Sequence, residues 1–253
     1  MLTMFKNEFG ERKQKILNAI VRDYQHSAEP VGSRTISRSY LPELSPATIR
    51  NEMADLEEEG LIVQPHTSAG RIPTDRGYRF YVDRLMKAVH PSHREEELVK
   101  EVFHKRSLNL DEILHRTARL LSHALDYTAI VVNLGSHRRI YSAGTPNLLH
   151  QPEFRDLDQM QRILELLEEE ELLAEVVEEY SSPAEVTVHI GSENKIKEAR
   201  KCSVVVSSFG LGDELTGGIG LIGPTRMYYS KATSLVDYVA KELSRVLAKG
   251  EIL

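Results

Sequence analysis

Three side chains in the first third of the chain have the chemistry to recognise the edges of nucleic-acid bases. Thr48, Arg50 and Asn51 lie close together and directly follow Ala47. Arginine donates paired hydrogen bonds to guanine, asparagine pairs in the same way with adenine, and the methyl groups of alanine and threonine contact thymine. Presented together on one surface, these residue types predict a structure that enters the major groove of DNA.

The helix that must carry these side chains has clear signals at both ends. Ser45 suits the N-cap position, because its hydroxyl can accept a hydrogen bond from an amide of the first turn. Pro46 suits the first helical position, where its missing N–H has no partner to lose. Gly60 is a natural stop. A short helix is therefore predicted between Ser45 and Gly60.

Apolar residues mark the buried side of this helix. Ile49, Met53 and Leu56 recur at i, i+4 and i+7, which makes one apolar stripe. Because a helix turns by about 100° per residue, the base-reading residues fall on the opposite side, with Arg50 at its edge. The helix is therefore expected to bury one face and to present the other to DNA.

A short β-hairpin is predicted directly after the helix. Residues 61–64 are β-prone, 65–70 form a turn cluster and 71–74 return. Arg71 is expected near the tip of this wing, within reach of a phosphate or the minor groove. His66 lies in the turn and is either structural or faces DNA. A helix–turn–helix followed by such a wing is typical of a winged-helix DNA-binding domain.

Two helices are predicted before it, over residues 11–27 and 33–40, the second capped by Ser33. Arg34 and Arg38 in the second helix either contact backbone phosphate or form a solvated surface. Phosphate contacts are expected from this helix, from Ser45 and from the wing. The full predicted DNA-binding set is Ser33, Arg34, Arg38, Ser45, Thr48, Arg50, Asn51, His66 and Arg71.

The domain is expected to close with a helix capped by Asp75 and running to about residue 89, with Tyr78 and Leu85 on its buried side. The charged segment 90–107 is predicted to be a linker with some helix. The predicted domains are thus 1–89 for DNA binding and 108–253 for a second function.

The second region alternates helices with apolar, β-branched runs, which predicts a sheet of about five strands in a mixed α/β domain. The acidic segment 156–180, with eight glutamates between 165 and 179, is expected to be one long helix with a solvated face. Turns are expected at 135–138 and 144–147. The remaining predicted helices are 108–125 and 230–248, and the predicted strands are 128–134, 139–143, 185–190, 203–209 and 216–222.

Overall charge gives only weak guidance about partners. The formal net charge is −6, which opposes nucleic-acid binding, but residues 1–90 hold 13 Lys and Arg against 12 Asp and Glu. The acids crowd into the far half of the predicted recognition helix. The single cysteine, Cys202, excludes a disulfide within one chain, and it is expected to be buried and inert. No apolar run approaches the ~18 residues of a membrane span, so no membrane partner and a reducing, cytoplasmic location are expected.

Some residues match the spacing or the residue types of known chemical motifs but lack the structural context that those motifs require. Gly218, Gly220 and Gly223 match the spacing of a dinucleotide fingerprint, but they lie inside a strand-like run and no helix follows at once. Close packing or a bend of the strand is the preferred interpretation. The histidines show no metal-binding spacing, and no Ser/His/Asp constellation has a supporting context. Neither an enzyme nor a cofactor or metal site is expected.

Long ungapped strings resemble the HrcA family of heat-inducible transcription repressors. In the first region these are AEPVGSRTIS at 28–37 and LSPATIRNEMADLEEEGLIVQPHTSAGRIPTDRGYRFYVD at 44–83. In the second they are TPNLLHQPEFRDL at 145–157, HIGSEN at 189–194 and IGLIGPTRMYYSKATSLVDYVAKELSRVL at 219–247. The resemblance implies an α+β protein with a winged helix and a GAF-like regulatory or dimerisation domain.

The same resemblance implies partners. A homodimer would bind an inverted-repeat operator of the CIRCE type ahead of chaperone operons, and the GroE chaperonin would modulate its activity. One departure concerns the dimer. The family usually carries a long inserted dimerisation segment, whereas only about ten residues, 135–144, are present here. Two other hypotheses remain open: a regulator with a small molecule in its GAF-like domain, and a chaperonin-binding or scaffold protein without a DNA role.

Overall fold

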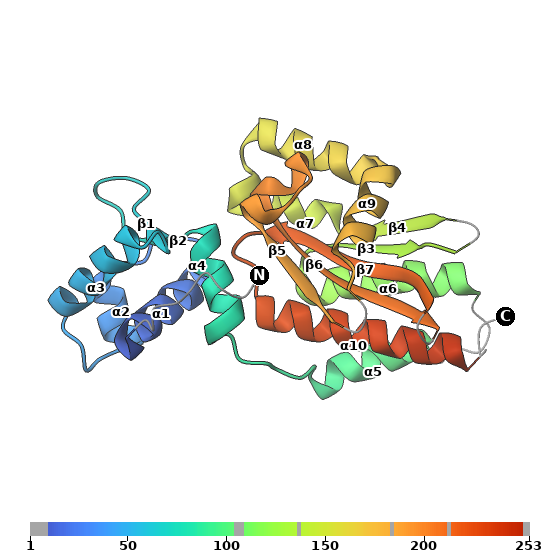
Figure 1. Ribbon diagram of the computed structural model, residues 1–253, viewed down its shortest axis with the longest axis horizontal. Helices are drawn as coiled ribbons and strands as arrows, with labels where there is room; N and C mark the ends of the chain where they lie inside the picture. The colour runs from blue at the N-terminus through green and yellow to red at the C-terminus, as the bar shows by residue number, and fades with distance from the viewer. Residues whose placement is uncertain (1–9, 104–108, 136–137, 183–184, 212–213, 250–253) are drawn as a thin grey trace. The chain divides into compact units, whose positions relative to one another are not determined.

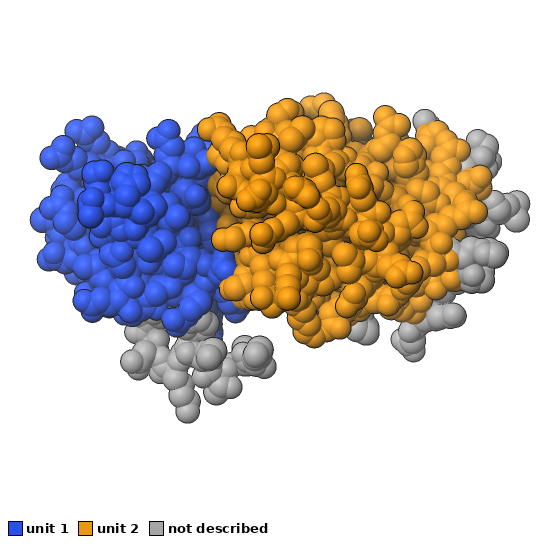
Figure 2. Space-filling model, turned by 90° about the horizontal axis from the view of Figure 1, so that it is seen from above, with its two compact units in different colours: residues 1–86 blue, residues 87–253 orange. Residues whose placement is uncertain are grey.

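A computed structural model describes residues 10–103, 109–135, 138–182, 185–211 and 214–249. The chain separates into two compact units, residues 1–86 and 87–253 (Figure 2). Each unit is described by itself below.

The first unit is helical with a small two-stranded sheet (Figure 1). Its strands pair antiparallel, with Ile62 opposite Pro73 and Val63 opposite Ile72. This is the predicted helix–turn–helix followed by a wing. Its elements are α1 (Glu11–Ser27), α2 (Ser33–Ser39), α3 (Pro46–Glu58), β1 (Ile62–Val63), β2 (Ile72–Pro73), α4 (Asp75–Phe80) and the π-helical turn η1 (Tyr81–Leu85).

The core of this unit consists of the predicted apolar stripes. Ile16 and Ile20 of α1 are fully buried, as are Ile49 and Leu56 of α3. Burying a side chain of this size contributes about 1.5–3 kcal/mol to folding. The packing of α3 against α1 and α2 therefore fixes which face of α3 remains at the surface.

Two of the predicted caps are wrong. The N-cap of α2 is Gly32, whose extended backbone leads into the helix, and Ser33 is the first helical residue. The N-cap of α4 is Thr74 rather than Asp75. The Thr74 hydroxyl accepts from the Gly77 amide at 3.1 Å and donates to the Gly60 carbonyl at 2.7 Å. Since this hydroxyl joins the turn after α3 to the start of α4, Thr74 fits the cap better than its neighbour. The helical segment also ends at Leu85, short of residue 89.

The second unit contains one five-stranded sheet and helices on both of its faces (Figure 1). The strand order is β4-β3-β7-β6-β5, and every neighbouring pair is antiparallel. The elements are α5 (His93–Phe103), α6 (Leu110–Leu125), β3 (Thr128–Asn133), β4 (Arg139–Ala143), α7 (Thr145–Leu149), η2 (Pro152–Phe154), α8 (Leu157–Glu168), α9 (Glu170–Tyr180), β5 (Thr187–Ile190), η3 (Gly191–Glu193), η4 (Lys197–Lys201), β6 (Cys202–Leu211), β7 (Glu214–Pro224) and α10 (Tyr229–Ala248).

Helices α6 and α10 pack on one face of the sheet and α9 on the other, where α8 extends the layer (Figure 1). The predicted fold class, a winged helix followed by a GAF-like α/β sheet domain, is confirmed. Within the segment 90–107, α5 packs against α6 and α10 and is part of the second unit. Glu95 of α5 accepts from the Ser92 hydroxyl at 2.6 Å and pairs with Lys231 of α10 at 3.3 Å.

Two predictions for this unit are wrong in detail. The turn expected at 144–147 is the start of α7, because Gly144 adopts φ 86° and leads directly into the helix. The long helix expected over 156–180 is two helices, since Glu169 leaves helical geometry with φ −90° and ψ 95°. The break lets each helix bury its own apolar side, with Ile163 on α8 and Val176 on α9.

The glycines with dinucleotide-fingerprint spacing lie inside β7, between β3 and β6. A Cβ atom at Gly218 would lie 2.3 Å from Cγ1 of Val177 on α9, and one at Gly220 would lie 2.8 Å from Cγ1 of Ile130 on β3. Close packing of α9 on the strand therefore requires glycine here. Across the described ranges, no helix is both long enough and apolar enough to span a membrane.

Candidate nucleic-acid interface

The N-terminus of α3 forms as its sequence predicts. Ser45 has an extended backbone and its hydroxyl accepts from the Thr48 amide at 3.1 Å. Pro46 occupies the first helical position. The cap satisfies one of the amides that a helix start leaves without a partner. The beginning of the recognition surface is therefore fixed locally.

The two sides of α3 are chemically distinct. Its apolar stripe is buried, whereas Ala47, Arg50 and Asn51 are exposed. Thr48 is half-buried, and its hydroxyl lies 2.9 Å from the Ser45 hydroxyl. The structure thus brings the predicted base-reading residues to one surface, with the Thr48 hydroxyl already engaged by the cap.

Exposed cations accompany this face. Arg34 and Arg38 of α2 are exposed, and α2 packs directly on α3. Among the described residues, Arg34, Arg38, Arg50 and Asn51 make no ion pair or side-chain hydrogen bond with one another or with other groups. These polar groups are therefore available to a partner outside the chain.

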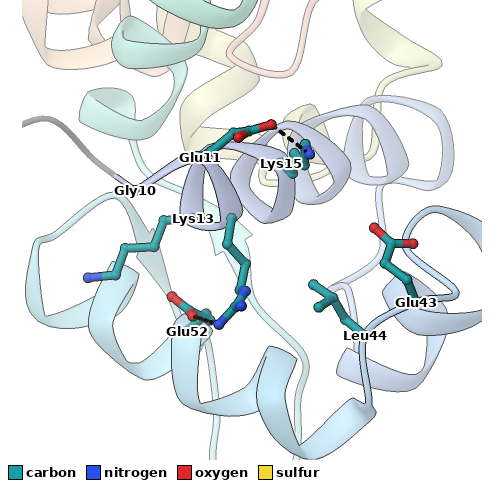
Figure 3. Close-up of a pocket in the computed structure, with 8 residues that line it drawn as sticks. Gly10, Glu11, Lys13, Lys15, Glu43, Leu44 and Glu52 are labelled. Carbon is teal, nitrogen blue, oxygen red and sulfur yellow. Dashed lines mark hydrogen bonds and ion pairs between the residues drawn. The ribbon is translucent and has the colours of Figure 1, made fainter.

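Most acids in the second half of α3 and at its C-cap lie beside cations of the same unit. Arg12 of α1 pairs with Glu52 at 3.4 Å, and Lys13 pairs with Asp55 at 3.0 Å and with Glu59 at 3.1 Å. Glu52 and Lys13 line the pocket of about 520 Å³ shown in Figure 3. Hydrogen bonds to the two carboxylates raise the pKa of Lys13.

Such partly exposed pairs contribute little to stability. They do reduce the negative charge of this half of α3, because its acids other than the exposed Glu58 each lie beside a cation. Arg12 and Lys13 were not in the predicted site, since their role depends on how α1 crosses α3.

One side-chain amide within the wing bridges the two sides of its loop. The Gln64 side chain donates to the carbonyl oxygens of Thr67 at 3.0 Å and Ala69 at 2.9 Å. His66 at the tip is exposed, and its Nδ1 lies 3.2 Å from the Ser68 hydroxyl. The tip therefore presents hydroxyl and imidazole groups rather than an arginine.

Arg71 lies at the base of the wing, and its predicted place near the tip is wrong. Its backbone exchanges two hydrogen bonds of 2.9 Å with Val31, directly before β2 begins. Its guanidinium Nε and Nη2 each lie 2.9 Å from Glu57 Oε2 on α3. Sequence reasoning did not identify Glu57, because nothing in the spacing of these residues indicates that they meet.

Helix–turn–helix geometry, an exposed Arg/Asn face and a wing, joined to a separate α/β unit, define a winged-helix transcription regulator. The profile described as the HrcA protein C terminal domain matches residues 92–233. The heat-inducible transcription repressor HrcA of Moorella thermoacetica is 36% identical, with 94% of this chain and 97% of the relative covered. The protein of the same name from Pelotomaculum thermopropionicum is 34% identical, with 96% and 98% covered. The chain belongs to the HrcA family of heat-inducible transcription repressors, a non-enzymatic class of regulator.

A solved structure described as that of a hypothetical protein supports the fold. It has a TM-score of 0.76 and 22% identity, and the match covers 95% of this chain and 98% of that one. The sequence comparison also shows a difference in length. The alignment with the Moorella protein runs over 336 residues whereas this chain has 253, so that relative carries at least 83 residues without a counterpart here.

The second unit offers little support for a small-molecule site. Its α9-facing core is filled by apolar side chains such as Val132, Val177 and Val204. A polar pocket of about 400 Å³ lies at the end of α6, lined in part by Ser122 and Asn147. Those two side chains bond each other at 3.1 Å. Cys202 is buried, and burial raises the pKa of its thiol to about 12. No group of metal-binding side chains is found among the described residues.

Proposed function

We propose that the first unit binds duplex DNA and that α3 is its recognition helix. Arg50 and Asn51 read base edges in the major groove, with Thr48 contributing its methyl group. The observation that carries this proposal is the division of charge on α3. Its acids other than the exposed Glu58 are paired inside the unit, whereas its exposed arginine and asparagine are free of partners among the described residues.

Phosphate contacts surround this base-reading face. Arg34 and Arg38 are exposed on the helix that packs against α3, and Ser33 and Ser45 lie at the two helix starts. Helix starts and exposed arginines both favour phosphate oxygens. His66 is one of the exposed residues of the wing tip, and it completes the interface.

A single recognition helix contacts only a few base pairs, so useful specificity requires two copies. The active form is a homodimer on an inverted-repeat operator of the CIRCE type, acting in the cytoplasm to repress heat-shock chaperone operons. The second unit supplies regulation and dimerisation, and the GroE chaperonin modulates activity. Family membership supports the repressor class, and the operator, dimer and chaperonin are proposed with it.

The test is operator binding by the full chain, measured by fluorescence anisotropy on an inverted-repeat duplex and on a shuffled duplex. Arg50→Ala and Asn51→Ala are each expected to lose about 1–3 kcal/mol per half-site and to relax base preference. Arg162→Ala, which removes an exposed arginine from α8 of the second unit, is the matched control. Operator affinity of both α3 variants equal to wild type would refute the base-reading assignment.

The oligomeric state is tested by size-exclusion chromatography with light scattering, with and without operator. A dimer on the duplex is expected. A strict monomer that binds one half-site as tightly as the whole repeat would rule out the two-copy arrangement.

A further inference from the structure

One carboxylate of α3 holds both sides of the wing. Oε1 of Glu57 accepts from the backbone N–H of Gln64 at 3.0 Å, where the chain leaves β1. Oε2 accepts from the Arg71 guanidinium at 2.9 Å, where the chain returns to β2. The Glu57 and Arg71 side chains are only 33% and 20% exposed. Both oxygens of Glu57 are therefore committed to the two ends of one loop.

The wing needs such a tie because its ladder is short. Strands β1 and β2 have two residues each, and an isolated two-stranded hairpin is marginal in water even when longer. The pairing of Arg71 with Val31 adds one more bridge. A Cβ atom at Gly70 would lie 2.5 Å from the Val31 carbonyl, so the loop passes tightly over that segment. The position of the wing tip depends on these few contacts at its base.

We infer that Glu57 is a positioning residue for the wing and that Arg71 acts through Glu57 rather than through a DNA phosphate. The guanidinium is within hydrogen-bond distance of a carboxylate, so its charge is already balanced within the unit. A balanced arginine releases little counterion when DNA binds. The planar fork of arginine suits this role, because it presents two donors in fixed geometry. The inference rests on the proposed DNA-binding function.

Salt-dependent operator binding separates this role from a phosphate contact. Glu57→Gln and Arg71→Ala are each expected to weaken operator binding about tenfold, and the double variant no more than either, because both remove one tie. The slope of log affinity against log salt is expected to stay at the wild-type value in Arg71→Ala and in the double variant. Arg38→Ala is the comparison variant, and it is expected to reduce the slope by about one.

Arg71→Lys sharpens the distinction. Lysine keeps the positive charge but lacks the fork, so a phosphate contact would be largely preserved, whereas a positioning role predicts a loss like that of Arg71→Ala. Unchanged or tighter binding by Glu57→Gln, together with a slope reduced by about one in Arg71→Ala, would overturn the inference. Thermal melting checks that each variant is folded.

A measurement without DNA keeps the inference separate from the proposed function. Amide hydrogen exchange of residues 64–70 in the free protein is expected to rise at least severalfold in Glu57→Gln, while exchange within α1 stays the same. Unchanged exchange in the wing would overturn the positioning role even if the wild type binds operator. Increased exchange in a protein that binds no operator would refute only the DNA-binding proposal.

Discussion

Helix α3 and strand β7 contrast in their roles. Helix α3 carries the proposed base-reading residues, whereas the residues of β7 only pack. On α3, stability and recognition occupy different faces: Ile49 and Leu56 are buried, and Arg50 and Asn51 are exposed. Strand β7 lies in the middle of its sheet, and from residue 217 to 224 all of it is buried. A helix packed on one side can change its exposed residues without losing its core. A central strand covered on both faces has no such freedom, so its residues are selected by packing alone.

Contacts with neighbouring elements explain both the glycines of β7 and the charged residues of α3. β7 is glycine-rich because α9 and β3 leave no room for Cβ atoms at Gly218 and Gly220. α3 is rich in charge because its rim pairs with α1 and with the wing base. In each case a pattern that resembles a ligand motif is produced by neighbouring elements. The exposed Arg50–Asn51 surface differs, since no neighbour among the described residues accounts for it.

The largest expected effect concerns Cys202 of β6, which pairs with β7. Burial raises the pKa of its thiol to about 12, so at pH 8 its thiolate fraction is about a thousandfold below that of a thiol with its ordinary pKa. Native protein is expected to react with a thiol-specific reagent far more slowly than the unfolded chain. The measurement is absorbance-monitored thiol titration, with the urea-unfolded chain as the positive control.

The sign of the associated pH dependence follows from the direction of the shift. The folded pKa lies above the unfolded one, so this contribution to stability is fully present below the unfolded pKa and is lost as pH rises toward about 12. Urea unfolding between pH 8 and pH 10 is expected to show decreasing stability. Rapid reaction of native Cys202 at pH 8 would contradict the packed sheet.

The core side of α3 gives the next effect. Leu56 is fully buried, so Leu56→Ala is expected to cost about 2–5 kcal/mol of unfolding free energy. Ala54→Gln, on the exposed side of the same helix, is expected to change it by less than about 0.5 kcal/mol. Chemical denaturation of both variants measures the difference. Equal destabilisation by the two would mean that α3 does not have separate faces.

A feature of these elements can be predicted from the sequence when its cause is local in the chain. The start of α3 was predicted correctly because Ser45 and Pro46 act within one turn. The apolar stripe was also correct, because it reflects the period of the helix itself. The division of 156–180 into α8 and α9 was missed, since the break falls at Glu169, which is neither glycine nor proline and gives no local stop signal.

The interface shows the same limit. Exposure of Arg50 follows from the helix period, but the Glu57–Arg71 tie follows from how the wing returns over α3. That return could not be derived from spacing. Likewise, Arg12 and Lys13 meet acids of α3 only because α1 packs against that helix. Residues that face solvent were therefore easier to predict than residues that hold them in place.

A smaller effect is expected in β7. Gly218→Ala places a methyl group 2.3 Å from Val177, and overpacking of this kind costs about 1–3 kcal/mol. Gly10→Ala is the matched control, because a Cβ atom there meets nothing within 4 Å. Thermal unfolding of the full chain measures both. A Gly218→Ala protein as stable as wild type would show that α9 can move away from the strand.

The smallest effect separates two roles at the start of α3. Ser45 caps the helix and is also proposed to contact phosphate, so Ser45→Ala is expected to cost about 1 kcal/mol of stability together with some operator affinity. Ser45→Asp keeps a capping oxygen and favours the positive helix end, so its stability is expected to match wild type. Its added negative charge would nevertheless repel phosphate, and operator binding should weaken more than in Ser45→Ala. Measured by melting and anisotropy on the same samples, stable Ser45→Asp with undiminished binding would leave Ser45 as a cap alone.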